Sequence, residues 1–151
     1  MIPPVSPSPK THSIGVFASV FDDDGRIVLV RQNYRGQCWG QPGGRLEAGE
    51  APVQGVLREI FEETGIRAEI TGFIGAYASP YRDDLVLHFR AQIVSREPWT
   101  PDDEIIGWET FAADALPSPM RATSRERIAD AAANRSNVFR THHTVDDFTD
   151  L

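Results

Sequence analysis

The strongest constraint on the fold is the segment from Pro52 to Gly65, which is predicted to be one helix with defined ends. Proline is tolerated in the first turn of a helix, where its missing N–H loses no hydrogen bond. Glycine is favoured just past the last turn. Between these ends, apolar or small side chains recur three and four residues apart, at Val53, Val56, Leu57, Ile60 and Thr64. This period predicts a helix with one buried face.

Strands are predicted on both sides of this helix. Ile14–Phe21 and Arg26–Arg31 are rich in β-branched and aromatic side chains, and Asp22-Asp23-Asp24-Gly25 separates them. Two apolar runs joined by an Asp-Gly turn predict a β-hairpin. After the helix, three further runs have the composition of strands: Ala68–Ala78, Leu85–Val94 and Glu104–Phe111.

A second helix is predicted near the end of the chain, because Thr123-Ser124-Arg125-Glu126 has the spacing of a capping box. We expect it to run to about Asn134. Residues 33–44 are rich in glycine and are predicted to be irregular. Strands before and after one helix, with a second helix late in the chain, predict the α/β (α+β) class, with a mixed sheet between helical layers.

Length and charge narrow the class of protein. A chain of 151 residues fits a single domain. Its net charge of −7 argues against a broad contact with long nucleic acid or an anionic membrane. No apolar run approaches the roughly 20 residues of a membrane-spanning helix. The single cysteine, Cys38, excludes an intramolecular disulfide and fits a reducing compartment, so a cytoplasmic location is expected.

The chain is expected to divide into three segments. Residues 1–12 (MIPPVSPSPKTH) have prolines where a signal peptide would have its apolar core, so they are predicted to be a flexible tail. Residues 13–134 contain the predicted strands and helices and are expected to form the domain. Residues 135–151 lack clear periodicity and are expected to be a tail that is either docked or disordered.

Five glutamates lie in and just before the predicted helix: Glu47, Glu50, Glu59, Glu62 and Glu63. Like charges at helical spacing destabilise a helix by roughly 0.2–0.5 kcal/mol per pair. Either these residues form a solvated acidic face, or a cation binds them. Carboxylate and carbonyl oxygens suit Mg²⁺ or Mn²⁺. Such ions bridge phosphate oxygens and lower the pKa of bound water, which is the chemistry of phosphate hydrolysis.

The same window resembles a known family signature. Gly44, Glu50 and the run from Arg58 to Ile66 (REIFEETGI) fill every fixed position of the Nudix box, GX5EX7REUXEEXGU, in which U is a bulky aliphatic residue. The chain therefore resembles the Nudix (MutT-like) hydrolases from about Ser13 to Leu116. This resemblance implies an αβα sandwich with a mixed central sheet, in which the box forms a loop, a helix and a second loop within a Nudix domain at 13–134.

The resemblance implies a metal site for Mg²⁺ or Mn²⁺. Glu59 and Glu63 match the principal metal ligands of the family, and Glu62 matches a further ligand. The Gly43 carbonyl matches a backbone ligand. Glu104 lies where many members carry a late acidic residue near the metals.

The resemblance also implies supporting roles. Arg58 resembles the family's orienting arginine, and Glu50 resembles a loop glutamate that supports the site and is sometimes discussed as a base. The general base differs between members, so that role stays open here.

The implied reaction is hydrolysis of a nucleoside diphosphate linked to another moiety, with water attacking phosphorus. ADP-ribose-like compounds, nucleotide sugars, dinucleoside polyphosphates and nucleoside triphosphates are all candidate substrates. The candidate substrate contacts are Arg31, Trp39, Arg45 and Tyr81. Many members have Leu or Phe at the position of Gln41, so the pocket is expected to differ from theirs. Many relatives also dimerise, which makes a homodimer an expectation.

Two other readings stay open. The first is a catalytically weak module that keeps the Nudix fold to bind or sense a nucleotide. The retention of Glu59, Glu62 and Glu63 favours the enzyme, because such modules have often lost box glutamates. The second is an isomerase of the isopentenyl-diphosphate type, for which Cys38 is a weak candidate nucleophile because it precedes the box.

Overall fold

The computed structural model describes residues 11–143, 148 and 149. Residues 1–10 of the expected N-terminal tail therefore lie outside the described residues, and so does part of the expected C-terminal tail. The elements are, in chain order, β1 (Ser13–Phe21), β2 (Ile27–Gln32), β3 (Trp39–Gly40), β4 (Gly43–Arg45), α1 (Pro52–Thr64), β5 (Ile66–Ser79), the 3-10 helix η1 (Pro80–Arg82), β6 (Asp84–Arg96), β7 (Ile105–Phe111), β8 (Met120–Arg121), α2 (Ala122–Ala132), β9 (Val138–Thr141) and β10 (Phe148–Thr149).

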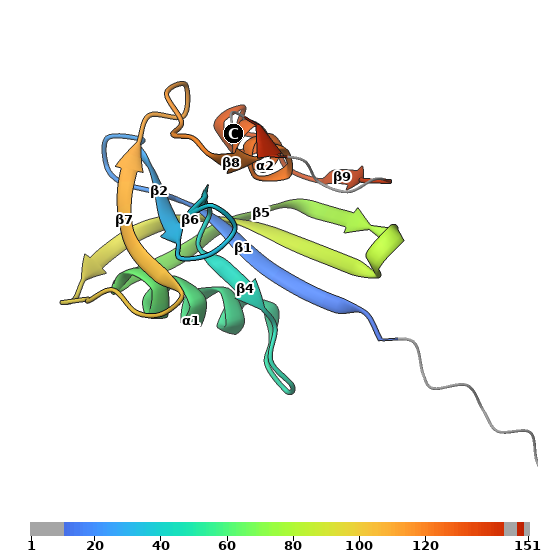
Figure 1. Ribbon diagram of the computed structural model, residues 1–151, viewed down its shortest axis with the longest axis horizontal. Helices are drawn as coiled ribbons and strands as arrows, with labels where there is room; N and C mark the ends of the chain where they lie inside the picture. Colours follow the sequence, from blue (N-terminus) through green and yellow to red (C-terminus); the bar gives the residue numbers. More distant parts are fainter. Residues whose placement is uncertain (1–10, 144–147, 150–151) are drawn as a thin grey trace, which may run out of the picture.

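The described strands form one mixed, curled sheet in the order β10-β8-β3-β2-β1-β6-β5-β9, with β4 paired to β1 and β7 paired to β2. Three pairs are parallel, namely β1 with β6, β3 with β8, and β5 with β9. The helices α1 and α2 lie on opposite sides of the sheet (Figure 1). The predicted class, a mixed sheet between two helical layers, is confirmed.

Alternate side chains of the central strands pack into two separate hydrophobic cores, one on each side of the sheet. Val16, Ala18 and Val20 of β1 are fully buried beneath α1, where they pack with Val56 and Ile60. On the other side of the sheet, alternate residues of β2 pack with β8 and with the middle of α2. That second cluster consists of Ile27, Leu29, Met120 and Ile128. Both helices are thus anchored by apolar burial, the main favourable term in folding.

The predicted hairpin between β1 and β2 is present, but its strands separate at once. They pair at Phe21 and Ile27, beside the Asp-Gly turn. Beyond this point β1 pairs with β6 and β4, and β2 pairs with β7 and β3. The short strands β3 and β4 therefore lie in the fork between β1 and β2, in a segment that was predicted to be irregular.

The predicted ends of the first helix are confirmed. Pro52 occupies the first turn, and Gly65 follows the helix in the left-handed conformation with φ of 73°. The predicted buried face is wrong at one position. Val53 is 44% exposed, whereas Gly55 and Glu63 are buried. The contact face is therefore rotated toward the carboxylates, because Glu63 packs against the sheet.

The predicted start of the second helix is displaced. α2 begins at Ala122, directly after β8, and Arg121 occupies the N-cap position without a side-chain cap. Thr123 therefore lies inside the first turn and does not cap the helix. Register with the sheet fixes this start, because Met120 pairs with Trp39 and is fully buried.

The described part of the C-terminal segment is attached to the sheet. β9 runs parallel to β5, with Val138 opposite Gly75. Arg140 of β9 forms two hydrogen bonds of 2.9 and 2.7 Å to the carboxylate of Asp130 in α2. Within the described residues, no helix is both long and apolar enough to cross a membrane.

Candidate active site

Two consecutive glycines allow the helix α1 to place its carboxylates directly on the sheet. A Cβ atom at Gly43 would lie 2.3 Å from the carbonyl oxygen of Val16, inside the backbone of β1. A Cβ atom at Gly44 would lie 2.6 Å from Oε1 of Glu59. Contacts this short exclude any larger residue without displacement. The glycine pair therefore determines how closely β4 approaches both β1 and the acidic side chains.

Glu59 and Glu63 form a pair of carboxyl groups at this contact. Glu63 is only 9% exposed, and its Oε1 accepts a hydrogen bond of 2.9 Å from the Gly43 amide. Burial raises the pKa of Glu63, and the charges of Glu59 and Glu104 raise it further. Burial is likewise the main cause of the raised pKa of Glu59. The pair therefore favours a shared proton when no cation is bound.

Arg58 organises the acidic residues around this pair. Its guanidinium forms two hydrogen bonds with Glu50, Nε to Oε2 at 2.7 Å and Nη2 to Oε1 at 3.0 Å. The same side chain donates to Glu59 at 3.0 Å and to Glu62 at 3.2 Å. The hydrogen bond from Arg58 lowers the pKa of Glu50. Glu50 is therefore an ionised anchor for Arg58, and Arg58 in turn orients Glu59.

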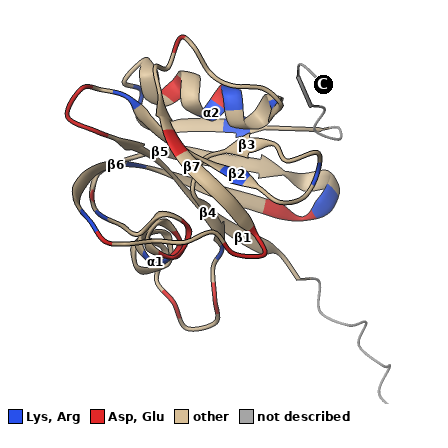
Figure 2. Ribbon diagram, turned by 60° about the vertical axis from the view of Figure 1, so that its left-hand side comes forward, with Lys and Arg blue, Asp and Glu red and all other residues tan. Residues whose placement is uncertain are grey.

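A cleft that we call the acidic cleft opens beside these residues, with a volume of about 420 Å³. Four carboxylates line it, from the loop before α1, from α1 and from the residue before β7: Glu47, Glu59, Glu63 and Glu104. Figure 2 shows acidic segments in the loop that leads to α1 and on α1 itself. The structure thus brings Glu104 into the same cleft as Glu59 and Glu63, although Glu63 and Glu104 are 41 positions apart in the sequence.

Two predicted residues lie elsewhere. Glu62 is outside the lining of the acidic cleft, with a side chain that is 58% exposed and paired with Arg58. Glu50 also lies outside it, because both of its oxygens accept hydrogen bonds from Arg58 or from the Glu47 amide.

The donor set of the acidic cleft fits a hard divalent cation. Within the described ranges, no group of three or more His, Cys, Asp or Glu side chains is already arranged to hold a metal ion. The four carboxylates nevertheless face one cleft, and two of them have a raised pKa. Binding of Mg²⁺ or Mn²⁺ would relieve the repulsion between these carboxylates, and oxygen ligands are those that these ions prefer.

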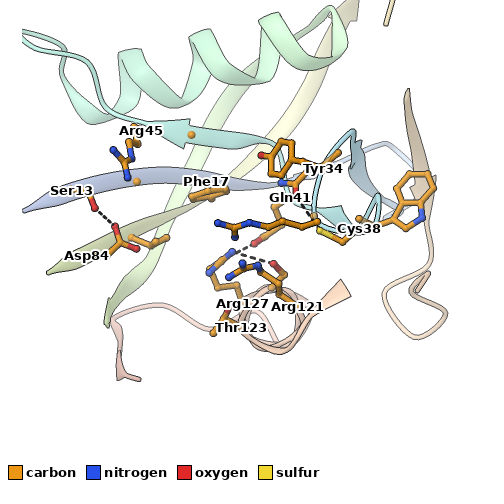
Figure 3. A pocket seen from close by; sticks show the side chains of 18 of the residues that line it. Ser13, Phe17, Tyr34, Cys38, Gln41, Arg45, Asp84, Arg121, Thr123 and Arg127 are labelled. Carbon is orange, nitrogen blue, oxygen red and sulfur yellow. Dashed lines mark hydrogen bonds between the residues drawn. The ribbon is translucent and has the colours of Figure 1, made fainter. Parts of the chain in front are cut away.

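A second cavity, the arginine pocket, adjoins the acidic cleft and has a volume of about 440 Å³. The two share part of their lining, including Tyr34 and Arg45. Five arginines line the pocket: Arg35, Arg45, Arg82, Arg121 and Arg127. Asp84 is its single lining carboxylate among the described residues. Figure 3 shows Arg45, Arg121 and Arg127 reaching into it from β4, β8 and α2.

The four predicted substrate contacts are placed differently from one another. Arg45 lines both cavities, and Trp39 lines the arginine pocket while its ring packs edge-on against Phe111 at 5.1 Å. Arg31 lines neither cavity. Its guanidinium lies 5.6 Å from the centroid of the Trp39 ring. Tyr81, in η1, is 41% exposed and also lies outside both cavities.

Comparison with known proteins assigns the family. A sequence profile of the NUDIX domain matches residues 11–131. The chain is 33% identical to a "MutT-like protein" of Streptomyces ambofaciens over 141 residues, which is 93% of this chain and 90% of the relative. The chain belongs to the Nudix hydrolase family. Members generally act on nucleoside diphosphate-linked substrates and use divalent cations.

Two further relatives show how widely this Nudix fold is used. An "ADP-ribose pyrophosphatase" of Methanocaldococcus jannaschii is 37% identical over 75 residues, or 48% of this chain and 44% of the relative. A solved structure described as a UDP-X diphosphatase superposes with a TM-score of 0.73 at 23% identity, covering 91% of this chain and 70% of the other. At this identity the structural match establishes the fold alone.

The unusual Gln41 of this Nudix chain has a structural explanation. Its side chain is buried, and its Oε1 accepts a hydrogen bond of 2.9 Å from Nε of Arg127. Its amide nitrogen lies 2.7 Å from Oγ of Ser19 and 2.9 Å from Nε2 of His88. An aliphatic side chain at this position could not accept the hydrogen bond from Arg127, so Gln41 and Arg127 form one unit.

A buried polar network continues from this unit behind the pocket. His88 is fully buried, and its Nδ1 lies 3.4 Å from the hydroxyl of Tyr77, which donates to Asp130 at 2.8 Å. Burial and the charge of Arg127 lower the pKa of His88 to about 3. His88 is therefore a neutral structural residue, and Tyr77 is engaged in holding α2 against the sheet.

Sequence reasoning missed most of the arginine pocket. Arg35, Arg82, Arg121 and Arg127 belong to a loop, η1, β8 and α2. No local spacing links these residues, and arginines on a short polar helix look like ordinary surface residues. The departure at Gln41 was the one available signal, because a polar residue there requires a polar partner.

Proposed function

We propose that this protein is a Mg²⁺- or Mn²⁺-dependent pyrophosphohydrolase that cleaves a nucleoside diphosphate linked to another moiety, with water attacking phosphorus. The observation that carries the proposal is that the buried Glu63 and the partly buried Glu59 share one cleft with Glu47 and Glu104. Maintaining such a pair costs stability unless a cation occupies the cleft. A solvated acidic face would leave these side chains exposed.

Glu59, Glu63 and Glu104 would hold the metal, together with the Gly43 carbonyl. The bound ion would neutralise charge on the diphosphate and lower the pKa of an attacking water. The protein's own part is to hold these carboxylates in place. The Gly43 amide fixes Glu63 by its hydrogen bond, and Arg58 fixes Glu59.

The contacts of the glutamates support different roles for them in this proposal. Glu50 is occupied by Arg58 and lies outside the acidic cleft, so we assign it a positioning role. Glu104 and Glu47 line the cleft, and either could accept a proton from water there. Glu62 remains a supporting partner of Arg58 in this proposal, because its side chain lies outside the cleft lining.

The test is a substrate panel assayed with and without Mg²⁺. It contains ADP-ribose, NADH, a nucleotide sugar, a dinucleoside polyphosphate and nucleoside triphosphates. Metal-dependent release of nucleoside monophosphate or diphosphate is expected for at least one compound. Glu63→Gln keeps the acceptor for the Gly43 amide, and we expect it to lower kcat by at least about 10²-fold. Glu69→Gln, an exposed change on β5, is the matched control.

A second measurement covers the possibility that the true substrate is not in the panel. Mg²⁺ should raise the thermal midpoint of the wild-type protein and of Glu69→Gln, and should raise that of Glu63→Gln much less. Equal effects of Mg²⁺ on all three proteins would contradict the metal site. Binding of Mg²⁺ and nucleotide without turnover of any compound would favour the sensing module over the enzyme.

A further inference from the structure

The turn that precedes β7 carries an inference that rests on the proposed function and extends it to two further residues. Glu104 lies at the end of this turn and lines the acidic cleft. We propose that Asp102 and Asn33 are positioning residues for the reaction. They act by fixing the backbone of Glu104, and thereby the direction in which its carboxylate enters the cleft.

The first argument is that the Glu104 side chain is not held by contacts of its own. Glu59 and Glu63 accept hydrogen bonds from Arg58 and from the Gly43 amide. Glu104 is exposed, and its carboxylate forms no hydrogen bond or ion pair with another described residue. Ordering an exposed glutamate costs side-chain entropy. A backbone that already directs this side chain into the cleft lowers the cost of using it there.

The second argument is that both peptide groups beside the Glu104 Cα atom are fully hydrogen-bonded, and two residues supply all the partners. Oδ1 of Asp102 accepts hydrogen bonds from the Glu104 amide at 2.8 Å and from the Ile105 amide at 2.7 Å. The side-chain amide of Asn33 donates to the Asp103 carbonyl at 3.2 Å, and its backbone amide donates to the Glu104 carbonyl at 2.8 Å. These four bonds fix φ and ψ of Glu104, although residues 101–104 are exposed.

The register between β2 and β7 explains why Asn33 reaches this turn. The pairing is regular up to Arg31 opposite Gly107, and the register then shifts by one residue. Such a shift is a β-bulge, a feature that re-aims side chains and is frequent beside active sites. Beyond the bulge, the backbone of Asn33 lies opposite that of Glu104 and bonds to it. The sheet itself therefore places Asn33 against the turn.

The turn is also connected to the helix that carries the other carboxylates. Nε1 of Trp99, three residues before Asp102, donates at 2.8 Å to the carbonyl of Glu62 in the last turn of α1. Figure 1 shows the segment between β6 and β7 running past this helix. Glu104 is therefore held relative to both β2 and α1. Residues that orient a metal ligand in this way typically change affinity or activity about 10–100-fold when replaced.

The test compares two neighbouring aspartates on the panel compound that the wild type cleaves. Asp102→Ala removes the acceptor of both amides, whereas Asp102→Asn keeps it, because asparagine forms the same kind of turn. Asp103→Ala is the matched control, since it removes the same charge from the same turn and keeps the carbonyl that Asn33 contacts. We expect Asp102→Ala to lower kcat about 10–100-fold with little change in KM. Asp102→Asn and Asp103→Ala should stay within about threefold of wild type.

A double variant separates positioning of Glu104 from a general effect on structure. Once Glu104→Ala has removed the carboxylate, adding Asp102→Ala should lower kcat by less than about twofold more, because the two changes act on one unit. Additive losses would overturn the inference. Asn33→Ala provides a second route if Asp102→Ala does not fold. It removes the bond to the Asp103 carbonyl and keeps the backbone amide, so we expect a smaller loss, about three- to tenfold, which also disappears with Glu104→Ala.

Binding of Mn²⁺, measured by calorimetry without substrate, gives a readout that does not depend on turnover. Asp102→Ala should weaken binding about tenfold, and Asp103→Ala should not. If Glu63→Gln loses activity while Asp102→Ala matches Asp103→Ala in kcat and in Mn²⁺ affinity, the inference is overturned and the proposed function stands. If the wild type binds Mn²⁺ but cleaves no compound, the affinities alone decide the inference. A wild type that neither cleaves nor binds Mn²⁺ would overturn the proposed function, and this inference with it.

Discussion

The guanidinium of Arg58 is joined to the carboxylate of Glu50 by two hydrogen bonds of 2.7 and 3.0 Å. This pair attaches the loop before α1 to the second turn of that helix. Gly55 makes the contact possible, because a Cβ atom there would lie 2.8 Å from Oε1 of Glu50. The pair therefore sets the orientation of Arg58 toward Glu59, one residue further along the chain.

Replacement of Glu50 tests whether it positions Arg58 or acts as the base. We expect Glu50→Gln to lower kcat about 10–100-fold, the usual effect of losing a residue that orients a metal ligand. The pH–rate profile should keep its shape, and Glu50→Asp should recover part of the activity. A loss above about 10³-fold, accompanied by disappearance of the acidic limb of the profile, would instead identify Glu50 as the general base.

The two glycines of β4 should differ when each is changed to alanine. In Gly44→Ala the new methyl group meets the end of the Glu59 side chain, so the carboxylate moves while the backbone stays. We expect a loss of activity of about 10²-fold with little change in the free energy of unfolding. In Gly43→Ala the methyl group meets the backbone of β1, and the protein should be destabilised by about 2–3 kcal/mol.

Gly107→Ala is the control for both glycine variants, because a methyl group at that position would enter open space, with none of the described residues beyond its chain neighbours within 4 Å. It should retain both activity and stability. Activity assays and urea unfolding of the three variants separate the two effects. Full activity in Gly44→Ala would show that the contact with Glu59 has no catalytic consequence.

The buried His88 predicts a dependence of stability on pH. Its pKa is lowered from 6.5 in the unfolded chain to about 3 in the folded protein, mainly by burial. Between these values the unfolded state binds more protons, so the free energy of unfolding decreases as the pH falls below 6.5. The contribution of this one group should reach about 2 kcal/mol at pH 5.

Comparison with a variant isolates the His88 contribution from those of the carboxylates. We expect His88→Gln to be destabilised at pH 7, because the buried network loses a partner. The difference in stability from wild type should become smaller as the pH falls from 7 to 5. Urea unfolding at several pH values measures this difference. A constant difference over that range would contradict the lowered pKa.

The attachment of α2 to β9 should be measurable as stability. Asp130 is 2% exposed and receives two hydrogen bonds from Arg140, so Arg140→Ala would leave a buried carboxylate short of donors. We expect a loss of about 2 kcal/mol. Arg135 lies 3.9 Å from the same carboxylate and is 59% exposed, so Arg135→Ala should cost less than about 0.5 kcal/mol. Equal losses in the two variants would contradict this distinction.

Local signals allowed part of this structure to be predicted. Pro52 and Gly65 marked the ends of α1, because each acts through its own backbone conformation. Helical spacing predicted that Glu59 and Glu63 lie together, and both line the acidic cleft. In contrast, β3 and β8 are two residues long, and their pairing joins segments that are about 80 residues apart. Strands this short carry no periodic pattern, so only tertiary contacts define them.

Two further features could not be predicted from local sequence patterns: the exposure of Val53, and the arginine pocket. Periodicity identified an apolar stripe on α1, but the buried position of Glu63 rotated the contact face away from Val53. The pocket arginines come from a loop, a 3-10 helix, two strands and α2. Their proximity is a property of the completed sheet, and composition shows only an acidic chain.

The fork between β1 and β2 makes the two cavities separately adjustable. One arm leads through β4 to the carboxylates of α1, and the other leads through β3 to β8 and α2. Insertions or deletions between β7 and β8 would shift Arg121 and Arg127 without altering the contact of Gly44 with Glu59. Chimeras that exchange residues 112–132 between relatives should therefore change which compound is accepted while they retain the same chemistry of bond cleavage.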